Sequence, residues 1–377
     1  MAPPQGLAPP TRTLLFLSAA VVVLAGVHAT REVLAPLFLA AVLVIIVHPI
    51  RHPLERRGWH RAAATTVVIV VVYLILLVLI AMLTFAGIQF ARLVQEYLSE
   101  LQEAVGSASS WLATLGLDQD AVSSITDAFQ PSQLLGVATS VSGAALGVAT
   151  TLFVVVTYVI FMSVDAARYD GAHVQFGATQ AGVLHRATTF NIGVRRYFVV
   201  SASFGAVVAV IDGIALWALG VPAPAVWAIL AFVTNFIPNI GFVIGVVPPT
   251  ILALVVGGWP LALAVIAVYS AVNVVLQVLV QPKFVADAVN ITLTLSFVSV
   301  IFWTFVIGPL GAILAVPLTL LTRALLLQGG PESAWYSWLS GEDLPAPARA
   351  VMQPDEEDTA PSPEPAPSPG PATPAAG

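Results

Sequence analysis

The chain has 377 residues, of which 58% are hydrophobic and only 9% are charged, and its formal net charge is −6. Soluble domains carry about 25% charged residues, so this composition excludes a soluble globular protein and predicts an all-α polytopic membrane protein. The lack of cysteine also excludes disulfides, thiolate metal sites and cysteine nucleophiles.

Residues 1–61 are predicted to form an N-terminal helical hairpin that ends in a basic cytoplasmic loop. Apolar segments cover 13–28 and 33–50, although a basic start, a short apolar core and "VHA" leave a cleaved signal over 1–29 as the alternative. The loop "RHPLERRGWHR" at 51–61 carries four arginines, which indicates the cytoplasmic side. No cysteines or clustered acids accompany its histidines, so no metal site is predicted.

Residues 62–163 are predicted to form two membrane helices, 62–88 and 138–163, around an external segment, 89–140. The external segment holds six acids and one arginine, as expected outside the cytoplasm. Its first part places apolar residues such as Leu93 and Tyr97 at helical spacing. The first helix is therefore expected to extend out of the membrane.

Residues 164–328 are predicted to be the core transport region. A basic cytoplasmic segment, 164–196, leads into spans at 197–219 and 261–280. Beyond this region, residues 329–377 are expected to be a disordered, Pro-rich and acidic cytoplasmic tail. Residues 326–377 contain eight acids and one arginine, so the acidity of the chain belongs to this tail and says nothing about a substrate.

Two apolar stretches of the core region contain residues that break helices. Residues 225–256, which include "TNFIPNIG", would form a helix about 48 Å long, too long for a hydrocarbon core of about 30 Å and too short for two spans. Residues 291–325 break in the same way at "GPLG", 308–311, and both breaks lead to a Val-Pro-x-Thr sequence. The sequence therefore predicts about six full transmembrane helices and two opposed re-entrant hairpins, about eight membrane segments in total.

Non-helical backbone at membrane depth must be buried in protein or line a wet cavity, so a transport pathway is expected at the two breaks. An amide stripe at helical spacing lies on the helix between them. Capping of half-helices and hydrogen bonds between helices are the alternative roles for these polar residues. The predicted pathway residues are Asn235, Pro238, Asn239, Gly241, Asn273, Gln277, Gln281, Gly308, Pro309 and Gly311.

Asp212 is the one carboxylate well inside a predicted span. An ionisable residue within a membrane points to a functional site, so Asp212 is a candidate ion or proton site. The alternative is a hydrated position in the outer interface.

Several segments resemble the autoinducer-2 exporter family of bacterial permeases: "NFIPNIG" at 235–241, then "PP", "QPKFVADAV" at 281–289, "FW" and "GPLGAILAVPLTLL" at 308–321. The match covers most of residues 10–328. The resemblance implies an inner-membrane exporter that forms homo-oligomers. The family also includes members reported as sodium–proton antiporters. Leu276 and Gln277 stand where many members have an acid and an asparagine, which puts cation coupling at that position in doubt.

Together these features predict a multi-pass permease of the bacterial inner membrane with both termini in the cytoplasm. It is expected to export a small polar solute by alternating access, without a cofactor. Its expected partners are the lipid bilayer, a small polar solute or cation, and copies of itself, and not nucleic acid. Hydrolase, zinc-protease and phosphate-loop motifs are missing, so no enzyme is predicted. The alternatives are a sodium–proton antiporter that uses Asp212, and a non-transporting membrane scaffold.

Overall fold

The computed structural model describes residues 9–100, 102–103, 106, 151–166, 168–169, 175–177, 179–238, 240–281 and 291–326. Every regular element within these ranges is a helix, which confirms the predicted all-helical class. Four of the described helices are long and apolar enough to cross a membrane: Arg31–Arg56, Arg61–Glu96, Ala181–Ala218 and Gly241–Val280. Shorter apolar helices accompany them, so the chain is a multi-pass membrane protein.

Several predicted features lie outside the described residues. They are most of the external segment 89–140, the first part of the 138–163 span, Asn239, residues 282–289 of the "QPKFVADAV" segment and the tail 329–377.

The N-terminal elements follow the predicted apolar segments. They are α1 (Pro9–Ala29), α2 (Arg31–Val47), η1 (His48–Ile50), α3 (Arg51–Arg56) and α4 (Arg61–Glu96). The 36 residues of α4 give a length of about 54 Å, well beyond a hydrocarbon core of about 30 Å. The helix that begins as the third predicted span therefore continues past it, as the spacing of Leu93 predicted.

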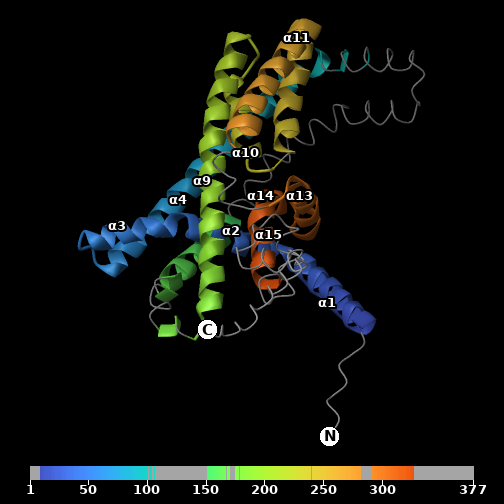
Figure 1. The fold of residues 1–377 in the computed structure, drawn as a ribbon. Helices are drawn as coiled ribbons and strands as arrows, with labels where there is room; N and C mark the ends of the chain where they lie inside the picture. The colour runs from blue at the N-terminus through green and yellow to red at the C-terminus, as the bar shows by residue number, and fades with distance from the viewer. Residues whose placement is uncertain are drawn as a thin grey trace, which may run out of the picture.

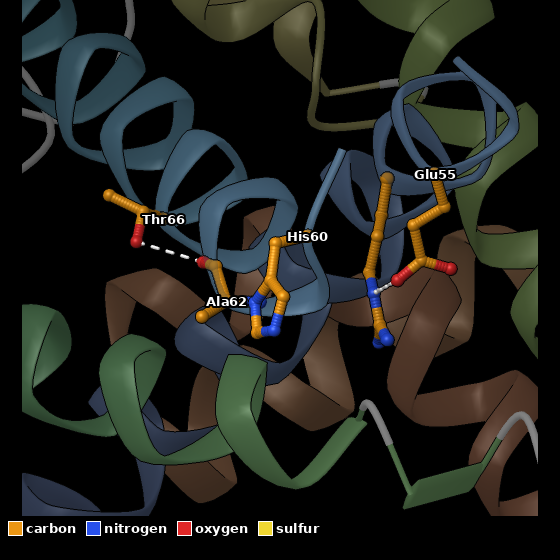
Figure 2. A network of polar contacts seen from close by, with 5 residues as sticks. Glu55, His60, Ala62 and Thr66 are labelled. Carbon is orange, nitrogen blue, oxygen red and sulfur yellow. Dashed lines mark hydrogen bonds and ion pairs between the residues drawn. The ribbon is translucent and has the colours of Figure 1, made fainter. Parts of the chain in front are cut away.

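The corner between α3 and α4 joins a buried arginine to an acid one turn away. Arg51 is 1% exposed, and its Nε donates a hydrogen bond to Glu55 Oε1 at 2.7 Å (Figure 2). At the start of α4, His60 Nδ1 accepts from the Ala62 N–H at 3.4 Å. Thr66 Oγ1 donates to the Ala62 carbonyl at 3.0 Å (Figure 2). The local polar groups of this basic loop thus fix where α4 begins.

α9 (Ala181–Ala218) is the long helix that supports the second half of the chain. It begins 16 residues before the predicted span 197–219, because the polar residues before Tyr197 continue the same helix. The other elements of this half are α10 (Pro224–Thr234), α11 (Gly241–Val272), η2 (Asn273–Val280), α13 (Leu293–Ile307), α14 (Pro309–Ile313) and α15 (Ala315–Leu326). Figure 1 shows α10 and α11 beside the upper part of α9, and α13 to α15 beside its lower part.

Both predicted breaks interrupt helices in the structure. α10 ends at Thr234 and α11 begins at Gly241, while α13 ends at Ile307 and Gly308 adopts φ 81° before α14. A further kink occurs at Gly258, with φ 67° and ψ −167°, where the first predicted hairpin ends. Positive φ is accessible to glycine without a steric penalty, so Gly258 and Gly308 set the points at which the chain changes direction.

The first helix pair is α10 and α11, the second is α13 to α15, and the tip of each pair is the turn at its break. The two tips contact each other. Ile237 and Ile240, from the turn between α10 and α11, pack against Val300, Ala312 and Ala315 from α13 to α15. In the neighbouring cluster, Phe236 of the same turn packs against a core formed by α2, α9, α13 and α15. The two breaks, 70 residues apart in the sequence, therefore meet beside α9.

Candidate functional site

The first break is a tight reversal that depends on glycine. α10 ends at Thr234, and a Cβ atom on Gly241, the first residue of α11, would collide with the Thr234 carbonyl oxygen. A second small residue, Gly245, lies one turn later, where a Cβ would approach Thr234 Oγ1 to 3.2 Å. The two glycines therefore let α11 pass directly over the end of α10.

α9 holds this turn through two hydrogen bonds. Asn235 Nδ2 donates to the Ser201 carbonyl at 2.7 Å, and the Tyr197 hydroxyl donates to the Phe236 carbonyl at 3.2 Å. Gly205 makes room for the amide, because a Cβ there would lie 3.0 Å from Asn235 Nδ2. The Asn235 side chain thus joins the turn to α9 through a hydrogen bond between helices.

A small polar cavity lies next to the turn. Its volume is about 20 Å³, and about 10–15 Å³ is enough to hold one water. Its polar lining residues come from α9, the first break, α11 and η2: Asp212, Thr234, Asn235, Tyr269, Asn273 and Gln277. Gly241 and Gly245 complete its backbone wall. Five residues singled out from the sequence, four polar side chains and Gly241, therefore come together at one place.

Two buried polar groups at this cavity have no hydrogen-bond partner among the described residues. Asp212 is 2% exposed and Tyr269 is 3% exposed, and Asp212 Oδ1 and the Tyr269 hydroxyl each lack a partner there. A buried polar group without a hydrogen bond costs about 1–3 kcal/mol, and more if it is charged. Asp212 is therefore shielded from bulk solvent, and a cavity occupant that bonds it would relieve this cost.

The amide stripe lies on an unusual helix. Residues Asn273–Val280 form a π-helix, in which the Gln281 N–H bonds the Leu276 carbonyl at 2.8 Å. Asn273 and Gln277 are half-buried and reach the cavity, whereas Val274 and Val278 on the other side are exposed. Gln281 is half-buried but is not among the cavity residues. π-turns are rare and frequently occur at functional sites.

The second break has the same tight geometry without the polar lining. A Cβ on Gly311 would collide with the Trp303 carbonyl, much as Gly241 would with Thr234. Gly308 and Pro309 form the corner before α14, and Trp303 Nε1 donates to Thr319 Oγ1 at 3.0 Å. The hydroxyls of α13 bond locally, since Thr292 caps the helix and Ser299 Oγ donates to the Ser296 carbonyl at 2.7 Å. Gly308, Pro309 and Gly311 are therefore not among the residues that line the polar cavity.

Two of the polar cavity residues were not predicted from the sequence, Tyr269 and Thr234. Tyr269 precedes Asn273 by four residues, so extension of the amide stripe by one helical turn would have included it. Pro238 lies in the turn and is half-buried.

Comparison with known proteins places the chain among transporters. The family model for AI-2E family transporters matches residues 17–329. The AI-2 transport protein TqsA of Escherichia coli K12 is 25% identical over 325 residues, which cover 86% of this chain and 94% of TqsA. YhhT of the same strain is 28% identical over 321 residues, covering 81% and 87% of the two chains. A Haemophilus influenzae relative is 28% identical over 337 residues, covering 88% and 96%. Because the family model spans most of the chain, the protein belongs to the AI-2E family of transporters.

Proposed function

We propose that this protein exports a small polar solute across the bacterial inner membrane by alternating access, and that the solute passes the polar cavity at the first break. The cavity carries the proposal, because it gathers a carboxylate, a phenol, a hydroxyl and three amides inside an apolar protein. Such groups are costly within a membrane unless they serve a ligand or one another. AI-2 is the first solute to test, because the relative TqsA is named for its transport.

The closed cavity of about 20 Å³ is too small for a solute larger than water. Solute entry must therefore separate the surfaces that now enclose it. The kink at Gly258 and the corner at Gly308 are suitable hinge positions, since glycine can change φ and ψ widely at low cost. This supports a mechanism in which helix pairs move as units.

Replacing both amides of the π-helix with leucine is expected to reduce AI-2 flux by at least about tenfold, because two buried polar contacts, each worth about 1 kcal/mol or more, are lost from the pathway. Flux is measured in proteoliposomes that contain the Asn273→Leu/Gln277→Leu protein. The matched control is Val274→Leu/Val278→Leu, on the exposed face of the same segment. Equal flux in both variants would favour a non-transporting scaffold or another pathway.

We further propose that the two helix pairs are re-entrant from opposite faces, with α10 and α11 entering from outside. A single introduced cysteine reports the accessibility of one position, because the chain has no cysteine of its own. Cysteine at Ala218 or Trp259 should react with an impermeant reagent only from outside. Cysteine at Leu293 or Leu325, which are 77% and 74% exposed, should react only from the cytoplasmic side. Labelling of Leu293 and Leu325 from opposite sides would contradict a second re-entrant hairpin.

Cation coupling at Asp212 is a second candidate function. The observation in its favour is that Asp212 is the one charged residue of the cavity and has an unbonded oxygen within the described part of the chain. A single carboxylate among neutral oxygens suits a monovalent cation or a proton. Radioactive sodium uptake driven by a pH gradient tests it, and uptake equal to that of protein-free vesicles would remove this candidate.

A further inference from the structure

A second polar cavity lies between α9 and α15, away from the proposed pathway. It has a volume of about 30 Å³, and its lining residues are Arg186, Thr189, Phe190, Gly193, Leu320, Arg323 and Ala324. α9 and α15 pack against each other along this region. The cavity is therefore built jointly by the long supporting helix and by the last helix of the second pair.

The chemistry of this cavity selects an anion. Two guanidinium groups and one hydroxyl line it, and none of the lining residues is acidic. Arg323 is only 8% exposed and Arg186 is half-buried, so their charges are felt more strongly than in open solvent. Guanidinium groups match carboxylates in geometry and form paired, charge-assisted hydrogen bonds with them. A volume of about 30 Å³ accommodates two or three water-sized groups, which suits a single carboxylate.

The chain itself carries the complementary charge. Fifty-one residues follow Leu326, and residues 326–377 hold eight acids and one arginine. Four of these acids are consecutive, the run "DEED" at 355–358. Arg323 lies three residues before the end of α15, so the acidic segment is attached next to the cavity. Tethering to the same chain gives an effective concentration in the millimolar range, and the 28 residues between Leu326 and Asp355 give ample reach.

We propose that the acidic run Asp355–Asp358 binds in this cavity, with its carboxylates on Arg186 and Arg323. The contact fastens the end of α15 to α9. It therefore ties the second helix pair to the helix that also holds the first break. The proposal is independent of which solute the protein moves.

Disulfide formation between two introduced cysteines tests this contact in the full chain. The pair Thr189→Cys/Gln353→Cys places one thiol on the cavity rim and one beside the acidic run. We expect it to form at least about tenfold faster than the pair Thr189→Cys/Thr373→Cys. The longer tether of the second pair slows closure by only about twofold, so specific docking is distinguishable from random collision.

Charge variants separate docking from proximity. We replace the acids by Asp355→Asn, Glu356→Gln, Glu357→Gln and Asp358→Asn. Disulfide formation in the Thr189→Cys/Gln353→Cys protein should then slow to the rate of the Thr189→Cys/Thr373→Cys protein. Arg186→Gln/Arg323→Gln should do the same, whereas Arg57→Gln, which removes an exposed arginine from the α3–α4 corner, should have no effect. The reversed pair, Asp355→Lys, Glu356→Lys, Glu357→Lys and Asp358→Lys combined with Arg186→Glu/Arg323→Glu, should restore fast disulfide formation.

Two results would overturn the proposal. One is equal closure rates for the two cysteine pairs. The other is fast disulfide formation in Thr189→Cys/Gln353→Cys that none of the charge substitutions slows. If anionic phospholipid copurifies with the wild-type protein and is lost only in Arg186→Gln/Arg323→Gln, while cysteine closure stays slow, the cavity binds a lipid headgroup and the tail does not occupy it.

Discussion

Alanine at Gly311 is expected to abolish transport and to lower the unfolding temperature, although only one methyl group is added. A Cβ at this position would collide with the Trp303 carbonyl and would lie 2.8 Å from Ile307 Cγ1. Backbone atoms cannot rotate away as a flexible side chain can, so α13 and α14 must separate. Overpacking costs about 1–3 kcal/mol in a core that can adjust, and we expect the upper end of this range or more here.

Gly241→Ala should behave in the same way, because its Cβ would meet the Thr234 carbonyl. The matched control is Gly26→Ala in α1, where no heavy atom lies within 4 Å of the added Cβ and where alanine favours the helix. Flux in proteoliposomes and thermal unfolding in detergent measure both effects. Wild-type flux in Gly311→Ala would show that the close passage of the backbone is not needed for function.

Asp212→Leu is expected to reduce solute flux by at least about tenfold, because an apolar side chain would replace the only charge in the cavity. The shape-conserving variant Asp212→Asn distinguishes two mechanisms. A protein that exchanges solute for a cation needs an ionised carboxylate, so its flux should rise with pH in the wild type and become independent of pH in Asp212→Asn. A protein that moves the solute alone should keep most of its flux in Asp212→Asn.

Flux between pH 5 and pH 8 in matched proteoliposomes measures this difference. Asp165→Asn, at the end of the helix Thr151–Ala166, is a control carboxylate outside the cavity. Wild-type flux in Asp212→Leu at every pH would exclude the cavity from the pathway.

The sequence predicted the positions of both helix breaks because their signals are local. Prolines and glycines interrupt apolar runs whose lengths match neither one span nor two. The extension of α9 to Ala181 was missed, since residues before Tyr197 are too polar for a hydropathy window although they continue the helix. Helix geometry and membrane hydropathy are separate properties, and only the second marks a span.

The cavity itself could be predicted only in part. The amides of Asn273 and Gln277 and the carboxylate of Asp212 stood out because polar groups are rare in spans. Their convergence with Tyr269 depends on how α9, α11 and η2 pack, which no local pattern encodes. Tyr269 lies one helical turn before Asn273, so the amide stripe pointed to its position, but only the packing of the helices shows that its hydroxyl is buried.

The contact between the two tips has a mechanical consequence. Ile237 and Ile240 meet Val300, Ala312 and Ala315 through side chains that carry no polar atoms, whereas the first turn is hydrogen-bonded to α9 at Ser201 and Tyr197. Sliding across an apolar surface breaks no directional bond, while separation from α9 breaks two. We therefore expect the plane of shear to run between the tips, with α9 and the first turn moving as one unit relative to α13 to α15. This sliding requires the acidic run to leave the cavity between α9 and α15.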